Sequence, residues 1–236
     1  MALLQKLKIE PPIIIINFKC YKEATGKSAL SLAKIAEKIS KKTGVCIAVA
    51  PQFTDIKTIA NEVRIPVLAQ HIDPIEPGAF TGHISLYALK EAGAIGSLIN
   101  HSEKRIKLSE IDEILSLMKN NEMVSVLCTN TAQVSAACAV LEPEIIAIEP
   151  PELIGTGIAV SKAKPEIIQN TVSLIRKVNS KVLILCGAGI TKGDDVKAAL
   201  DLGSQGVLVA SGVVKSKNPE LSLYDLAESA MKAKSK

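Results

Sequence analysis

Eight short runs of apolar and β-branched residues recur along the chain, and this repetition constrains the fold more than any other feature of the sequence. Strands that are apolar at nearly every position are buried on both faces, as in a parallel sheet covered by helices. We therefore expect eight parallel strands joined by crossover connections. The eight runs occupy residues 13–18, 45–50, 67–71, 95–100, 123–128, 145–149, 182–187 and 206–210.

The stretches between these runs show helical spacing. One apolar stripe beside several lysines consists of Ala29, Leu30, Leu32, Ala33, Ile35, Ala36 and Ile39. Similar patterns occupy residues 110–119, 132–141, 165–178, 194–202 and 223–231. Eight such units in 236 residues predict an α/β fold, a single (β/α)₈ barrel domain over residues 1–236.

An open, doubly wound sheet is the structural alternative, because periodicity does not reveal whether the eighth strand pairs with the first. Two observations argue against it. No G-x-G-x-x-G motif follows the first run, and no linker or change of composition divides the chain.

Composition excludes several classes of protein. Lys and Arg number 28 against 24 Asp and Glu, a mild excess that suits a small anionic ligand, and the absence of tryptophan argues against a nucleic-acid partner. The longest apolar runs fall far short of the roughly 18 residues of a membrane span. Residues 1–10 lack the pattern of a signal peptide, and five scattered cysteines fit reduced thiols, so we expect a cytoplasmic protein without a membrane partner.

Polar or reactive residues close most of the apolar runs. In a barrel the loops at the carboxyl ends of the strands form the active face, so these residues should meet at one mouth. One lysine, one histidine and one glutamate would then converge. The residues concerned are Asn17 and Lys19, Gln70 and His71, Asn100 and His101, and Glu149.

Glycine turns follow the last two runs, as Gly187-Ala188-Gly189 and Ala210-Ser211-Gly212. A residue without Cβ lets backbone N–H groups approach an anion, so the two turns together predict a phosphate cradle, although either alone also fits an ordinary tight turn. Residues 149–157 place two prolines before two glycines and could form a rigid tip that covers a ligand; a simple turn is the alternative.

These motifs match one family. Asn17-Phe18-Lys19, Asn100-His101-Ser102-Glu103, Glu149-Pro150 with Ile154-Gly155-Thr156-Gly157, and both glycine turns stand in the same order as in triosephosphate isomerases. The chain resembles that family over essentially its whole length, and its shortness resembles the archaeal branch. The resemblance implies reversible interconversion of D-glyceraldehyde 3-phosphate and dihydroxyacetone phosphate through an enediolate, in glycolysis and gluconeogenesis, without metal or organic cofactor.

The resemblance also implies catalytic roles. Glu149 would be the base that acts on carbon, and His101 a neutral electrophile kept uncharged by the positive end of the helix that follows it. Lys19, supported by Asn17, would stabilise the phosphate and the developing enediolate charge. Glu103 would pair with the lysine or assist catalysis.

Substrate-binding residues are implied in the same way. Backbone N–H groups of the glycine turns and of the segment after Glu149 would hold the phosphate. Glu152 and Leu153 depart from the Trp-Ala usual in bacterial and eukaryotic members, which puts hinge contacts and closure rates in question, and His71 stands where those members have Asn. The implied binding residues are Asn17, Phe18, Lys19, Ile154, Gly155, Gly189, Ala210 and Ser211.

Residues 70–82 resemble the protruding third loop of the family, which docks into a neighbouring subunit and implies a homodimer or homotetramer. Two other functions stay open. A different phosphate-barrel enzyme, such as a ribulose-phosphate epimerase or an indole-pathway synthase, would share the glycine turns, but an epimerase would want metal-ligating histidines and carboxylates at several strand ends. A non-catalytic phosphosugar-binding scaffold would tolerate loss of Glu149 or Lys19, and both are present.

Overall fold

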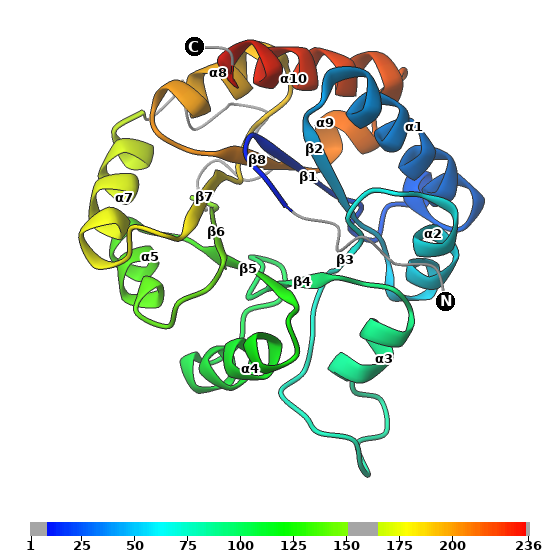
Figure 1. The fold of residues 1–236 in the computed structure, drawn as a ribbon, viewed down its shortest axis with the longest axis vertical. Helices are drawn as coiled ribbons and strands as arrows, with labels where there is room; N and C mark the ends of the chain where they lie inside the picture. Colours follow the sequence, from blue (N-terminus) through cyan, green and yellow to red (C-terminus); the bar gives the residue numbers. More distant parts are fainter. Residues whose placement is uncertain (1–8, 151–164, 235–236) are drawn as a thin grey trace.

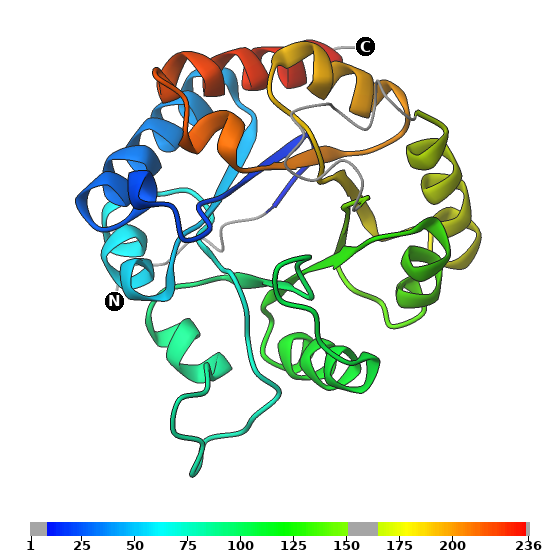
Figure 2. The same cartoon turned by 180° about the vertical axis from the view of Figure 1, so that it is seen from behind.

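The computed structural model describes residues 9–150 and 165–234. Eight parallel strands stand in a ring with helices around the outside (Figure 1), and the view from behind shows the same ring from its other end (Figure 2). The strands are β1 (Ile13–Asn17), β2 (Cys46–Ala50), β3 (Leu68–Ala69), β4 (Gly96–Ile99), β5 (Val124–Thr129), β6 (Ile145–Ile148), β7 (Leu183–Cys186) and β8 (Gly206–Val209).

The pairing of the strands decides between a barrel and an open sheet. Hydrogen bonds run in the order β2-β1-β8-β7-β6-β5-β4-β3, so the last strand pairs in parallel with the first. A parallel bridge between Val49 in β2 and Val67, just before β3, spans the remaining gap. The predicted (β/α)₈ barrel is confirmed, and the open sheet is excluded.

Helices fill the connections. Gly44 ends the first helix in a left-handed conformation with its N–H donated to the Ser40 carbonyl, a frequent C-cap. Three helices, given below as α2, α3 and α9, have only seven, six and four residues, which is too short for a helical periodicity to appear in the sequence. The helices are α1 (Lys27–Thr43), α2 (Ile56–Glu62), α3 (Leu86–Glu91), α4 (Leu108–Asn120), α5 (Ala132–Ala139), α7 (Pro165–Val178), α8 (Gly193–Asp201), α9 (Ser211–Val214) and α10 (Pro219–Lys234).

Alternate residues of each strand enter two separate cores. In β1, Ile13 and Ile15 pack inside the barrel, while Ile14 and Ile16 pack against the surrounding helices. All four are fully buried, and each contributes roughly 1.5–3 kcal/mol by leaving water. This period of two also decides which residues at the strand ends point toward the mouth.

The connection from β3 to α3 protrudes from the barrel in both views. Its base is fastened by a hydrogen bond from the Asp73 N–H to the Ile84 carbonyl (2.9 Å) and by the Asp73 carboxylate, which accepts from the Ile84 N–H (2.7 Å). The same carboxylate lies 2.9 Å from Nε2 of the buried His71. Residues 76–83 are all exposed, so the loop has a hydrogen-bonded base and an exposed tip.

No described helix combines the length and the apolar composition that a bilayer-spanning segment needs.

Closure of the barrel at β8 depends on a glycine. A Cβ added to Gly206 would lie 2.2 Å from the carbonyl oxygen of Ile13, so the two strands would have to separate. We expect Gly206→Ala to lower the free energy of unfolding by about 3 kcal/mol, measured by denaturant titration. Gly78→Ala is the control, since its Cβ would meet only the Phe80 ring, at 3.4 Å. Equal stability of the two variants would contradict the expectation.

Candidate active site

A cavity of about 200 Å³ opens at the carboxyl ends of the strands. Most of the residues predicted for the site line it: Asn17, Lys19, His101, Glu103, Glu149, Gly189, Ala210 and Ser211. They come from strand ends that are up to about two hundred positions apart along the chain, and parallel closure of the barrel brings them to one mouth.

Lys19 lies two residues after the end of β1 in a left-handed conformation, with φ of 48°. Such a conformation is unfavourable for a side chain longer than glycine, so neighbouring groups must hold it. The Asn17 side chain accepts the Lys19 N–H at 2.9 Å, and Gln70 donates its amide to the carbonyls of Lys19 and Ala50, both at 2.9 Å. Asn17 therefore helps to hold the Lys19 backbone in this conformation.

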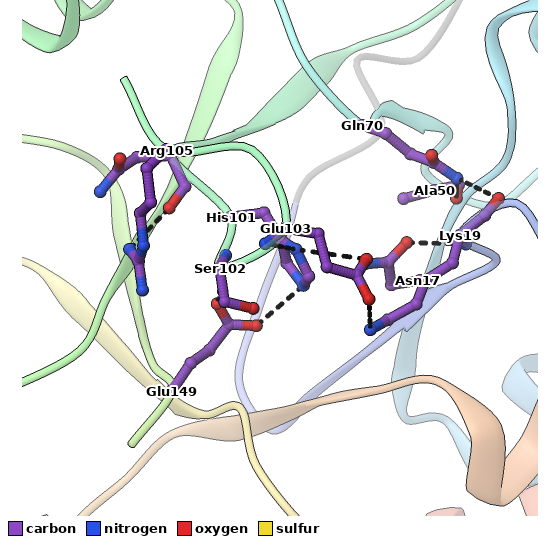
Figure 3. Close-up of polar contacts among 10 residues, drawn as sticks. Asn17, Lys19, Ala50, Gln70, His101, Ser102, Glu103, Arg105 and Glu149 are labelled. Atoms are coloured by element: carbon purple, nitrogen blue, oxygen red, sulfur yellow. Dashed lines mark hydrogen bonds and ion pairs between the residues drawn. The ribbon is translucent and has the colours of Figure 1, made fainter. Parts of the chain in front are cut away.

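The Lys19 ammonium is paired with the Glu103 carboxylate at 2.7 Å. In Figure 3 the Glu103 side chain lies between His101 and Lys19. Glu103 is 60% exposed and Lys19 only 16%, so solvent reaches the carboxylate more readily than the ammonium. An anionic ligand that enters the cavity would therefore reach the Lys19 ammonium, because the exposed Glu103 carboxylate does not cover it.

His101 is held by both ring nitrogens. The backbone N–H of Glu103 donates to Nδ1 at 3.2 Å, and Nε2 lies 3.0 Å from Oε1 of Glu149. Because Nδ1 accepts a hydrogen bond, the single proton of a neutral ring sits on Nε2 and points to the carboxylate. The backbone thus selects the Nε2–H tautomer.

The helix expected directly after His101 is not there. The chain turns instead, with the Lys104 N–H donated to the His101 carbonyl at 2.8 Å, and α4 begins only at Leu108. The physical reason lies in the preceding residue, because Asn100 is left-handed (φ 57°) and redirects the chain away from a helical path. The N–H group that faces the imidazole belongs to this turn rather than to a helix.

Glu149 follows β6 and is 3% exposed. Its second carboxylate oxygen accepts the Ser102 N–H at 3.3 Å, so two adjacent residues of the turn hold the carboxylate (Figure 3). Gly187 is packed against it, since an added Cβ there would lie 2.9 Å from Cγ of Glu149. Any side chain at position 187 would displace the carboxylate.

Two further residues at the carboxylate went unrecognised in the sequence. Burial, and then the charge of the Glu149 carboxylate, raise the pKa of the Cys128 thiol well above its usual range. The Ser102 hydroxyl is buried beside the carboxylate without a partner among the described residues. The signal for Cys128 was its position at the end of the fifth apolar run. This signal is missed when cysteine is counted only as an apolar residue.

The structure does not bring every expected binding residue to the cavity. Phe18 is fully buried in the outer core, because it lies between two residues that face the mouth and so points the other way. Ile154 and Gly155, with the departures at Glu152 and Leu153, fall outside the described residues.

The two glycine turns touch each other. Gly189 is left-handed (φ 73°), and a Cβ added to Gly212 would lie 3.0 Å from the Ile190 carbonyl oxygen. The turns therefore pack as one surface beside Lys19, as a cradle for an anion would require. Within residues 9–150 and 165–234, no three His, Cys, Asp or Glu side chains meet as ligands for a metal ion.

A closed parallel barrel whose mouth joins a buried carboxylate, an imidazole and a lysine defines an acid–base barrel enzyme for a small anionic substrate. Comparison with known proteins narrows this class. The family model described as triosephosphate isomerase matches residues 12–230. The chain belongs to the triosephosphate isomerase family.

Individual relatives agree with the family model. The triosephosphate isomerase of Methanothermus fervidus is 53% identical over 218 residues, which cover 92% of this chain and 98% of the relative. Those of Methanocaldococcus jannaschii and Methanosarcina barkeri are 54% and 53% identical over 91% of this chain, and 98% and 97% of their own lengths are covered. The resemblance to the archaeal branch is thereby confirmed.

The raised pKa of Cys128 predicts its reactivity. Only a thiolate is alkylated at an appreciable rate, so iodoacetamide at about pH 8 should modify the exposed Cys20 and react with Cys128 at least about tenfold more slowly. Peptide mass spectrometry of the folded protein measures both rates. Unfolding in denaturant is the control and should equalise them; equal rates in the native protein would contradict this description of Cys128.

Proposed function

We propose that this protein interconverts D-glyceraldehyde 3-phosphate and dihydroxyacetone phosphate, with Glu149 as the base and His101 as the electrophile. The observation that carries the proposal is the convergence of one carboxylate, one Nε2–H imidazole and one lysine on a cavity of about 200 Å³, the size of a small metabolite. Family membership supports the same reaction.

Proton transfer would begin at Glu149. Its carboxylate removes a proton from the carbon next to the substrate carbonyl, and the C–H electron pair becomes the carbon–carbon double bond of an enediolate. The Nε2–H of His101 donates to the carbonyl oxygen as negative charge develops on it. The hydroxyl proton passes to the former carbonyl oxygen, with the His101 ring between the two oxygens, and Glu149 returns its proton to the neighbouring carbon. The substrate is thereby isomerised without net gain or loss of atoms.

The carboxylate must first leave His101. In the structure Oε1 of Glu149 occupies the Nε2–H that a substrate oxygen would need. A bound substrate would replace the carboxylate at Nε2 and free it for the substrate carbon. The Ser102 hydroxyl, buried and without a partner among the described residues, would be available to the carboxylate once it has moved.

Lys19 and the glycine turns would bind the charged end of the substrate. The ammonium reaches both the phosphate and the developing enediolate, and N–H groups at Gly189 and Ser211 contact phosphate oxygens. Glu103 sets the position of the ammonium through its ion pair. We extend the phosphate site to Gly155 and Ile154 from the family pattern alone. The chemistry calls for no metal or organic cofactor.

Substitution of the base tests the mechanism. In a coupled assay with D-glyceraldehyde 3-phosphate, Glu149→Gln should lower kcat by at least about 10²-fold, because the amide cannot accept a proton from carbon. The matched control is Glu142→Gln, an exposed carboxylate paired with Lys119 far from the cavity, which should keep wild-type turnover. Normal turnover in the Glu149 variant would reject Glu149 as the base, and an inactive wild-type protein would reject the reaction itself.

We also propose that the protein is a cytoplasmic homo-oligomer, a dimer or tetramer, assembled through residues 70–82. Phe80 is 45% exposed at the tip of the protruding loop, with its ring edge-on to His83. An exposed aromatic side chain on a loop with a fastened base suits insertion into a second subunit. None of the five cysteines, all within the described residues, forms a disulfide, which suits a reducing compartment.

Substitution at the loop tip tests the assembly. Phe80→Asp should reduce the mass measured by light scattering toward the 25.0 kDa of one chain, because a buried unpaired charge destabilises an interface. Leu221→Asp is the matched control, an apolar side chain 65% exposed on α10, and should leave the mass unchanged. A Phe80 variant with the wild-type mass would argue against this interface.

A further inference from the structure

We propose that Asn100 is a positioning residue that sets the distance between the His101 imidazole and the Glu149 carboxylate by tying the end of β4 to the end of β5. The inference rests on the roles proposed above for His101 and Glu149. It assigns to the asparagine a task separate from substrate contact, because Asn100 does not line the cavity.

The conformation of Asn100 is the first observation. Among the residues that the structure describes, four other than glycine have left-handed φ: Lys19, Asn100, Glu122 and Glu142. Glu122 and Glu142 lie in exposed turns at the other end of the barrel, whereas Asn100 is 7% exposed and immediately precedes His101. Asparagine adopts this conformation more readily than most residues, but glycine would do so at lower cost. The presence of asparagine rather than glycine at position 100 must therefore be explained by the contacts of its side chain.

Hydrogen bonds of the side chain supply that reason. The Asn100 amide donates to the Cys128 carbonyl at 3.0 Å, and its oxygen accepts the Ile106 N–H at 3.1 Å. Both ends of the amide are thus used within the protein. One bond crosses from the end of β4 to the end of β5, and the other closes the turn that carries His101.

Arg105 strengthens the same link. Its guanidinium donates to the Asn100 carbonyl at 2.8 Å and to the Cys128 carbonyl at 3.3 Å. Asn100 and Cys128 are therefore linked twice, once by the Asn100 side-chain amide and once by the Arg105 guanidinium.

The two linked residues adjoin the two reacting groups. His101 is next to Asn100 in the chain, and the carbonyl of Thr129, the residue after Cys128, accepts the Glu149 N–H at 2.7 Å. A shift of β4 against β5 would change the separation of Nε2 and Oε1, which is 3.0 Å. Small errors in the placement of reacting groups are costly in the transition state and much less so in ground-state binding.

Asn100→Gly tests the link, because glycine accepts the left-handed conformation while removing the amide. We expect kcat for D-glyceraldehyde 3-phosphate to fall about ten- to a hundredfold and KM to change by less than about twofold. The KM should persist because the proposed phosphate contacts lie on other strands. Glu142→Gly, at φ 55° on an exposed turn, is the control for glycine at a left-handed position and should match wild type.

Asn100→Asp isolates the donor. Aspartate has the same shape and still accepts the Ile106 N–H, but it cannot donate to the Cys128 carbonyl. We expect kcat to fall in this variant too. A Gly variant with wild-type kcat, a fall in thermal midpoint alone, a rise in KM that matches the fall in kcat, or an Asp variant as active as wild type would each overturn the proposal.

A readout without turnover completes the test. The chain has three histidines, so a His101→Gln spectrum assigns the imidazole nitrogens of His101 by NMR. The wild-type protein should show one tautomer with Nε2 protonated, and Asn100→Gly should shift both signals toward a tautomer average; unchanged signals would count against the proposal. An inactive wild type would reject the proposed function while this measurement still judged Asn100.

Discussion

The parallel pairing of β8 with β1 is the constraint on which the rest of the structure depends. It requires the backbones of Gly206 and Ile13 to approach more closely than any side chain allows, so a glycine stands where the ring closes. Parallel strands all point the same way, and closure therefore gathers eight carboxyl ends at one mouth. Without that pairing, Lys19 after β1 and the glycine turns after β7 and β8 would lie at separate edges of a sheet.

Two of the four left-handed non-glycine residues in the described part of the chain lie at the mouth. Lys19 is one of the proposed functional groups and Asn100 precedes another, and each is held by amide side chains that reach across to another strand. Strained residues of this kind persist only where their surroundings determine them fully. The apolar cores stabilise the fold. Part of that stability offsets the conformational cost of holding a few functional groups at the rim, where hydrogen bonds fix their positions.

Much of this arrangement could be predicted from the sequence. Strand order along the chain, burial on both faces and the polar residues at strand ends follow from local patterns, so Lys19, His101 and Glu149 could be placed at one mouth. The direction of a side chain beyond a strand end was harder, and Phe18 shows this, because its motif concealed the period of two that turns it into the core.

Contacts between distant residues could not be predicted at all. Gln70 reaches Lys19 across 51 positions and Asn100 reaches Cys128 across 28, and no local pattern encodes either hydrogen bond. The prediction of a helix directly after His101 was wrong for a related reason. Helix propensity was judged from the residues that follow His101, whereas the left-handed Asn100 before it determines the path of the chain. Such tertiary effects override local preference mainly at functional sites.

In the proposed mechanism a neutral His101 serves the base as well as the substrate. A protonated ring would form a full ion pair with Glu149 in a buried site, where opposite charges attract strongly and release is costly. Two groups of Glu103 face Nδ1: the backbone N–H, which competes with a proton there, and the carboxylate at 3.7 Å, which favours one. The ring then holds the carboxylate through one N–H, a bond that a substrate oxygen can replace in kind. The same backbone group that selects the tautomer for an electrophile therefore keeps the base free to leave it.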